Sequence, residues 1–125
     1  MKIICGVDSS DECTRALELA VRLGFPAPSF ELVNVIERLS PFVYGEFSAG
    51  TDSVNEVLQT QQSLGREALE NGRKVLKRLF VEPGDMDMPL VSSMREGFIA
   101  NELSALAEER RADLIAIGNS GLGRI

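Results

Sequence analysis

Two short segments of the chain carry residue types that can hold a small anionic molecule. Gly6-Val7-Asp8-Ser9-Ser10 places a carboxylate and two hydroxyl groups directly after an apolar run. Gly118-Asn119-Ser120-Gly121-Leu122-Gly123, after another apolar run, offers unhindered backbone N–H groups that could surround a phosphate. Ligands of open α/β sheets bind where strands end, so we expect a small-molecule site here if the two preceding strands are neighbours.

Both segments also have a structural explanation. The glycines of the second segment are spaced G-x-x-G-x-G rather than as the dinucleotide fingerprint G-x-G-x-x-G, and the sequence has no Walker A lysine. Read alone, a glycine-rich turn after a strand is more often a tight turn than a phosphate cradle. Ser9 and Glu12 have the S-x-x-E spacing of a capping box, which predicts that the serines start a helix and that Asp8 can join the cap.

The chemistry open to the chain is narrowed by its composition. The sequence contains no histidine, which removes the commonest general base and zinc ligand and excludes hydrolase triads that depend on histidine. Its 13 basic and 19 acidic residues give a net charge of −6, which argues against binding to a nucleic-acid backbone. Cys5 and Cys13 form neither a CxxC pair nor a disulfide framework, so a reducing compartment is expected.

Length and hydropathy predict one domain, residues 1–125, in the cytoplasm. No apolar run approaches the roughly 20 residues needed to span a bilayer. The opening residues, Met1-Lys2-Ile3-Ile4-Cys5-Gly6-Val7, pass directly into a strand-like run and do not resemble a secretory signal. We therefore expect no contact with a membrane.

Strand-like and helical patterns alternate along the chain. They predict strands over residues 3–8, 30–36, 88–94 and 113–117, and helices over 13–21, 54–79 and 99–111. This order implies an α/β fold, with an open, mostly parallel, doubly wound, Rossmann-like sheet and helices on both of its faces. Pro89 favours a sheet edge for the third strand. Residues 37–52 predict a long loop, either a plain surface loop or a functional lid.

Spacings of three and four residues predict which side of each helix is buried. The first helix should bury Cys13, Ala16, Leu17, Ala20 and Val21. The long second helix should bury Val54, Val57, Leu58, Leu64, Ala68, Leu69, Val75, Leu76 and Leu79, with Gly65 and Gly72 weakening it. The third should bury Ile99, Leu103, Leu106 and Ala107.

Four segments, taken in order, resemble the universal stress protein family. They are Ile4-Cys5-Gly6-Val7-Asp8-Ser9-Ser10, Leu32-Val33-Asn34-Val35-Ile36-Glu37, Arg95-Glu96-Gly97, and Ala112-Asp113-Leu114-Ile115-Ala116-Ile117-Gly118-Asn119-Ser120-Gly121-Leu122-Gly123. The resemblance extends over essentially the whole chain and is least informative in residues 37–52. It implies the strand order 3-2-1-4-5 and, in the ATP-binding branch, a nucleotide lying across the ends of the first and fourth strands.

In that branch the resemblance implies roles for individual residues. Asp8 would approach the adenosine, the backbone of Val35 would meet the adenine edge, and Gly118 and Gly121 would contact the phosphates. The expected nucleotide-binding residues are Gly6, Val7, Asp8, Ser9, Val35, Ile117, Gly118, Asn119, Ser120, Gly121 and Gly123. Mg²⁺ is expected to accompany a bound triphosphate, held mainly by the phosphates.

The sequence departs from the family pattern near its end. Gly118-Asn119-Ser120-Gly121 supplies only the first half of the family's phosphate motif, and the second half and the fifth strand would lie beyond Ile125. Asn119 also stands where many relatives carry serine. We therefore expect a truncated chain or one half of a tandem protein, in which ATP binding strengthens when the missing segment is restored. The alternative is a domain that completes its sheet in another way, with a second copy packed against the edge of the fourth strand.

These observations predict a regulatory module that binds ATP or a related adenine nucleotide and works as a homodimer or beside a tandem partner. Any hydrolysis should be slow and metal-assisted, because no general base is evident. The alternative is a nucleotide-independent dimerisation or interaction module of the same fold. An enzyme with Cys5 or Cys13 as nucleophile is disfavoured, because both thiols are expected to be buried and inert.

Overall fold

The computed structural model describes residues 1–37, 51–79 and 90–118. Its elements are β1 (Lys2–Gly6), α1 (Asp11–Arg22), β2 (Ser29–Ile36), α3 (Thr51–Leu79), β3 (Leu90–Glu96), α4 (Ile99–Arg110) and β4 (Leu114–Ile117). The predicted alternation of strands and helices is confirmed, with shifts of a few residues at the boundaries. Of the predicted loop over residues 37–52, residues 38–50 lie outside the described residues, and residues 51 and 52 belong to α3.

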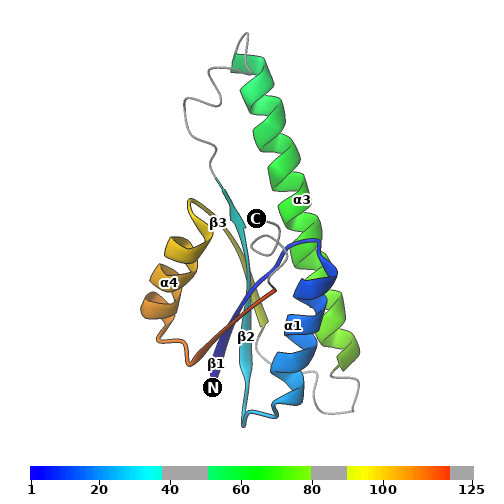
Figure 1. Ribbon diagram of the computed structural model, residues 1–125, viewed down its shortest axis with the longest axis vertical. Coiled ribbons are helices and arrows are strands. Elements are labelled where there is room, and N and C mark those ends of the chain that lie inside the picture. Colours follow the sequence, from blue (N-terminus) through cyan, green and yellow to red (C-terminus); the bar gives the residue numbers. More distant parts are fainter. Residues whose placement is uncertain (38–50, 80–89, 119–125) are drawn as a thin grey trace.

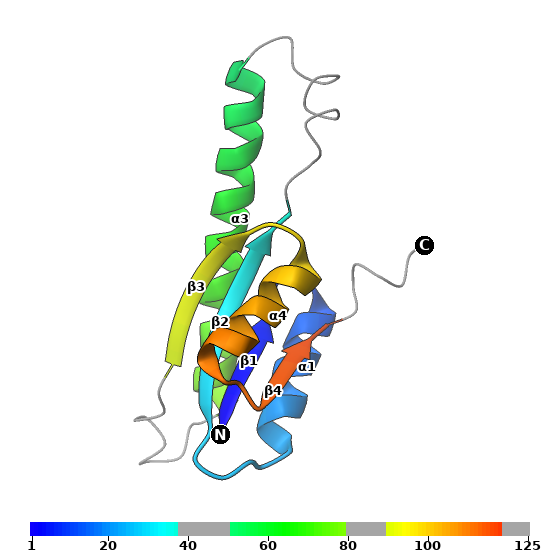
Figure 2. The same ribbon diagram turned by 90° about the vertical axis from the view of Figure 1, so that its left-hand side faces the viewer.

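The strands form one all-parallel sheet in the order β3-β2-β1-β4. This confirms the α/β class, the first four positions of the expected order and the edge position of the third strand. Helices α1 and α3 cover one face of the sheet and α4 covers the other (Figure 1). Figure 2 shows α4 lying across the sheet, with the two other helices behind it.

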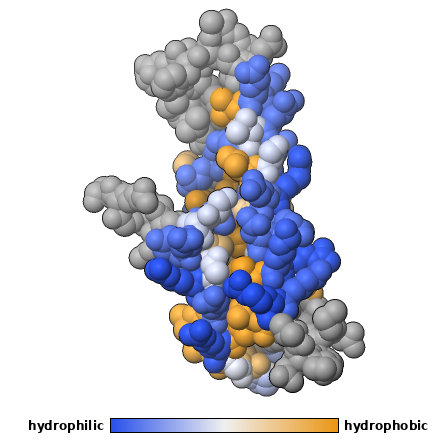
Figure 3. Space-filling view, turned by 90° about the vertical axis from the view of Figure 1, so that its right-hand side faces the viewer, coloured by the Kyte–Doolittle hydropathy of each residue, from blue (hydrophilic) through white to orange (hydrophobic). Residues whose placement is uncertain are grey.

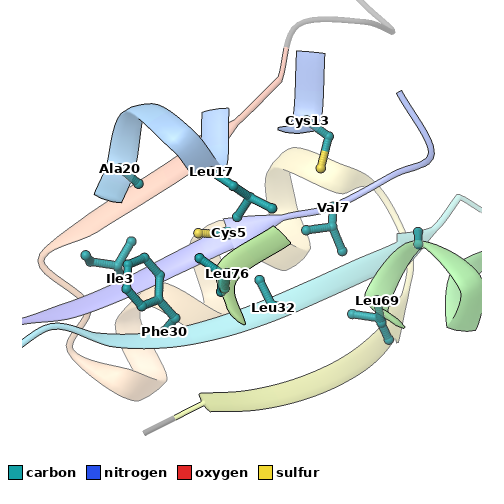
Figure 4. Close-up of a cluster of buried hydrophobic side chains, with 11 residues drawn as sticks. Ile3, Cys5, Val7, Cys13, Leu17, Ala20, Phe30, Leu32, Leu69 and Leu76 are labelled. Atoms are coloured by element: carbon teal, nitrogen blue, oxygen red, sulfur yellow. The ribbon is translucent and has the colours of Figure 1, made fainter. Parts of the chain in front are cut away.

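The larger core lies between the sheet and helices α1 and α3 (Figure 4). It contains Ile3, Cys5, Val7, Cys13, Leu17, Ala20, Phe30, Leu32, Ala68, Leu69 and Leu76. A smaller cluster under α4 contains Ile4, Val33, Leu103 and Leu106. Because β1 and β2 contribute to both clusters, the central strands are apolar on both sides, which is typical of parallel strands covered by helices on both faces.

The long helix buries only part of its predicted apolar side. Ala68, Leu69 and Leu76 are buried, but Val57 and Leu64 are 40% and 52% exposed, so their predicted burial is wrong. The reason is length: the 29 residues of α3 span about 43 Å, whereas the eight residues of β2 span about 26 Å. The first half of α3 therefore rises beyond the carboxyl edge of the sheet (Figure 1).

A buried carboxylate joins the sheet to the last turn of α4. Glu31 of β2 is only 9% exposed, and its Oε1 accepts a hydrogen bond from Nε of Arg110 at 3.0 Å. Its Oε2 accepts from the hydroxyl of Ser93 at 3.5 Å. This pairing explains a charged residue within an otherwise apolar strand. None of the helices in the described segments is both long enough and apolar enough to cross a membrane.

Candidate functional site

The carboxyl edge of the sheet brings the ends of β1 and β4 together. Gly6 of β1 lies opposite Ile117 of β4 in the parallel register, so Asp8 and Gly118 leave the sheet at the same edge. This placement confirms, for Gly118, the expectation that the two segments face one another. The other predicted residues of the second segment, Asn119, Ser120, Gly121 and Gly123, lie outside the described residues.

A hollow of about 280 Å³ opens at this edge, between α3 and the start of α4, and we call it the strand-end hollow. It is lined by Asp8, Ser9, Asn34, Val35, Ile36, Glu37, Gln61, Leu64, Gly65, Ala68 and Ile99. Three of the predicted site residues, Asp8, Ser9 and Val35, therefore lie together. Its volume is close to the lower end of the range of about 300–1,000 Å³ typical of small-molecule sites.

The turn after β1 is held by the side chain of Asp8. Its Oδ1 accepts a hydrogen bond from the backbone N–H of Ser10 at 2.9 Å and another from the Ser10 hydroxyl. Ser10 Oγ in turn accepts from the backbone N–H of Cys13 at 3.2 Å, so Ser10 is the N-cap of α1. The predicted Ser9–Glu12 capping box is wrong by one residue, because the Asp8 carboxylate fixes the cap at Ser10. Ser9 is exposed and lines the hollow.

The other walls come from β2, α3 and α4. Asn34 donates from Nδ2 to the carbonyl of Val7 at 2.9 Å, which ties the end of β2 to the end of β1. Gly97, at φ +143°, donates its backbone N–H to the carbonyl of Ile36 at 3.0 Å and so holds the start of α4 beside β2. Gly65 brings α3 close, since a Cβ there would lie 2.5 Å from Asn34 Oδ1.

Asn34, Ile99 and the α3 residues of the hollow were not predicted from the sequence as site residues. The predicted burial of Ile99 is wrong: its side chain is 42% exposed and lines the hollow, because Ile99 is the first residue of α4. The signal for Asn34 was a polar side chain within an apolar strand. The signal on α3 was Gln61, a polar residue one turn before Gly65 on the side predicted to be buried.

The remaining predicted residues do not line the hollow. Val7 is 4% exposed within the core. Gly6 faces α4, where a Cβ would lie 3.0 Å from Cγ2 of Ile117 and 3.2 Å from Cδ1 of Leu103. Gly118 presses on the first turn of α1, where a Cβ would lie 2.7 Å from the backbone nitrogen of Cys13. Close packing accounts for glycine at both positions.

A larger hollow of about 440 Å³, here called the helix groove, lies between α1 and α3 and shares Asp8 and Ser9 with the first. Figure 3 shows this side of the molecule, where polar surfaces on the two helices flank an apolar seam. Lys74 and Arg78 line the groove, and Arg78 pairs with Glu18 at 3.5 Å. We favour the strand-end hollow as the site, because it lies where the strands end and contains three predicted residues.

The two thiols are unsuited to nucleophilic chemistry. Burial raises the pKa of Cys5 to about 12, and the neighbouring Cys13 adds a smaller contribution. Burial also raises the pKa of Cys13, although a backbone hydrogen bond at Asp8 opposes the rise. Both side chains are buried, so neither offers a thiolate to a substrate near neutral pH.

Comparison with known proteins identifies the family. The model of the universal stress protein family matches residues 1–125. The chain belongs to the universal stress protein family. A curated universal stress protein of Methanocaldococcus jannaschii is 28% identical over 120 residues, covering 96% of this chain and 65% of the relative. The chain thus spans somewhat less than two thirds of the length of that relative.

Solved structures of universal stress proteins share the fold. The protein UspA from Lactobacillus plantarum matches with a TM-score of 0.69 and 18% identity, over 100% of this chain and 83% of that one. A universal stress protein family member from Arabidopsis thaliana, solved with AMP bound, matches with a TM-score of 0.65 and 15% identity, over 100% and 80%. These likenesses support the open parallel sheet seen here.

Proposed function

We propose that the chain is a regulatory module that binds ATP or a related adenine nucleotide in the strand-end hollow. The observation that carries the proposal is the hollow itself, which joins Asp8, Ser9 and Val35 at the carboxyl ends of β1 and β2. These are positions at which the family resemblance implies nucleotide contacts. The AMP-bound relative from Arabidopsis thaliana supports the choice of an adenine nucleotide.

The hollow offers groups suited to the nucleoside. The exposed carboxylate of Asp8 can accept hydrogen bonds from ribose hydroxyls, and the backbone at Val35 can meet one edge of the base. Leu64 and Ile99 are 52% and 42% exposed and both line the hollow. Apolar side chains left open at a site are suited to the flat faces of a purine ring.

The phosphates are assigned to the segment that begins at Gly118, where backbone N–H groups would serve as donors. The described residues contain no group of three or more histidine, cysteine, aspartate or glutamate side chains that could hold a metal ion. A Mg²⁺ ion that accompanies a triphosphate would be held mainly by the phosphates themselves. The protein would hold the nucleotide in place, and the Mg²⁺ ion would neutralise part of the negative charge of the phosphates.

We assign the nucleotide a regulatory role rather than turnover. The chain has no histidine, and the Asp8 carboxylate already accepts two hydrogen bonds from Ser10. Neither feature supplies an evident general base. Occupancy would therefore act by changing conformation or partner choice, in a cytoplasmic protein that works as a homodimer or with a tandem partner.

Isothermal titration with AMP and with ATP plus Mg²⁺ tests the proposal. We expect saturable binding, weakened about tenfold by Asp8→Asn, which keeps an acceptor for Ser10 but removes the charge. Asp11→Asn, in the exposed first turn of α1, is the matched control and should bind like the parent chain. Absence of binding would favour the alternative, a nucleotide-independent interaction module.

A further inference from the structure

We infer that Gln61 of α3 recognises the N6 amino group and N7 of the bound purine, and so makes the site select adenine over 6-oxopurines. The inference rests on the proposed nucleotide function and adds to it the residue that decides which base is accepted.

The position of Gln61 follows from the geometry of α3. Gln61, Gly65 and Ala68 follow one another at spacings of four and three, so they lie on one side of the helix, and all three line the strand-end hollow. Gly65 and Ala68 are buried against the sheet. Gln61 is one turn nearer the start of α3, where the helix passes the end of β2. The amide is therefore placed above the carboxyl edge of the sheet, beside the proposed base.

The amide of Gln61 has an unmet hydrogen-bonding requirement. Its Oε1 is buried, and it is the one buried side-chain oxygen or nitrogen without a partner in the segments that the structure describes. Two other polar side chains of the hollow have partners: Asn34 donates to Val7, and Asp8 accepts from Ser10. A buried acceptor without a donor is costly, and the Gln61 side chain recovers that cost if it rotates its amide into the hollow toward a ligand that brings a donor.

The chemistry of a carboxamide identifies the donor. The side chain of glutamine offers an acceptor oxygen and a donor NH₂ side by side, and adenine offers the complementary pair in its N6 amino group and N7. Oε1 would accept from the amino group while Nε2 donates to N7. A 6-oxopurine turns an acceptor oxygen toward Oε1 and cannot satisfy it. The second hydrogen of the amino group and N1 stay available to the backbone at Val35.

The experiment compares three ligands and three proteins by isothermal titration. The ligands are AMP, IMP, which carries an oxygen in place of the amino group, and 7-deaza-AMP, which lacks the N7 acceptor. The proteins are the parent chain, Gln61→Leu and, as a matched control, Gln59→Leu, since Gln59 is an exposed glutamine of the same helix. Far-ultraviolet circular dichroism checks that each variant is folded.

We expect the parent chain and Gln59→Leu to prefer AMP over IMP, and Gln61→Leu to lower that preference about tenfold. The parent chain should bind 7-deaza-AMP about fivefold more weakly than AMP, because one hydrogen bond is lost, and Gln61→Leu should bind both alike. AMP binding with an unchanged AMP to IMP ratio in Gln61→Leu overturns this inference alone. If Gln61→Leu is unfolded, equal binding of AMP and 7-deaza-AMP to the parent chain overturns it. No AMP binding by the parent chain overturns the proposed function as well.

Discussion

Asp8, in the turn between β1 and α1, serves both the fold and the candidate site. Its carboxylate fixes Ser10 as the N-cap of α1 and also lines the strand-end hollow. The negative charge lies at the positive end of the helix dipole, which favours it. A ligand that contacts Asp8 can therefore alter the hydrogen bonds to Ser10 and, through them, the N-terminal cap of α1.

Gly118→Ala should destabilise the fold by about 1–3 kcal/mol. The added Cβ would lie 2.7 Å from the backbone carbon of Glu12 and from the backbone nitrogen of Cys13, and backbone atoms cannot move aside as the end of a side chain can. Urea denaturation measures the loss. Unchanged stability of the variant would show that the end of β4 does not pack closely against α1. Phosphate contact would then be the only remaining explanation for glycine at position 118.

Cys5 should resist alkylation in the native chain from pH 7 to pH 10, because its thiol is buried and its pKa is raised to about 12. The same rise in the pKa of Cys5 sets how the stability of the fold changes with pH. Unfolding lowers the pKa to the ordinary value of 9.0, so stability is unaffected below that pH and falls as the pH rises from 9 toward 12. Iodoacetamide labelling followed by mass spectrometry measures the reactivity. Labelling of the folded chain as fast as that of the unfolded chain, with a rate that levels off near pH 9, would contradict the burial of the thiol.

At the scale of elements, α3 both covers the core and overhangs the carboxyl edge of the sheet. Its second half buries Leu69 and Leu76 against the sheet, and its first half forms one wall of the strand-end hollow. Gly65 and Gly72 lie on the buried side and set how closely the helix approaches. Because both parts belong to one helix, the packing of its second half against the sheet determines where its first half lies beside the hollow.

Gly65→Ala should lower the melting temperature more than Gly72→Ala. A Cβ at Gly65 would lie 2.5 Å from Asn34 Oδ1 and 2.8 Å from Met94 Cε, whereas at Gly72 the nearest atoms, of Leu32 and Val7, lie at 3.3 Å. Alanine gains about 1 kcal/mol of helix propensity at either position, so the difference between the variants reports the packing cost. Differential scanning calorimetry measures both. The reverse order would show that α3 does not make its closest approach at Gly65.

At the scale of the whole molecule, the sheet is covered unequally. Two helices cover one face and α4 alone covers the other among the described residues, leaving Ile115 and Ile117 of β4 38% and 48% exposed. Within the same residues, no strand pairs with the outer edge of β4. Such an edge favours pairing with another strand, and a second copy of the chain is the partner we propose.

Ile115→Lys should shift the chain from dimer to monomer, raising the dissociation constant at least about tenfold, because a charge on an edge strand opposes pairing. Leu19→Lys is the matched control: Leu19 is 59% exposed on α1, which lies on the other face, and this variant should remain dimeric. Analytical ultracentrifugation measures both. A monomeric parent chain would contradict the proposed pairing.

Particular residues show how far the sequence predicts the site. The family resemblance implies Asp8, Ser9 and Val35 as site residues, and they lie together in the hollow because the carboxyl ends of parallel strands share one edge. The resemblance also implies Gly6 and Ile117, but these two residues lie opposite one another in the sheet on the side that α4 covers. A motif is continuous along the chain, whereas side chains of a strand alternate between its two faces, so neighbours in sequence are separated by the sheet.

The sequence by itself determined the α/β class, the alternation of strands and helices and a mostly parallel sheet, because these depend on local periodicity and on the order of elements. Only the tertiary structure decided that Ser10 rather than Ser9 caps α1, that Val57 and Leu64 stay exposed, and that Gln61 and Gly65 line the hollow. Each of these depends on a contact between segments far apart in the chain or on the length of one element relative to another. Helical periodicity predicts which side of α3 is apolar. How much of that side is buried depends on where β2 ends along the helix, and only the packing of α3 on the sheet shows this.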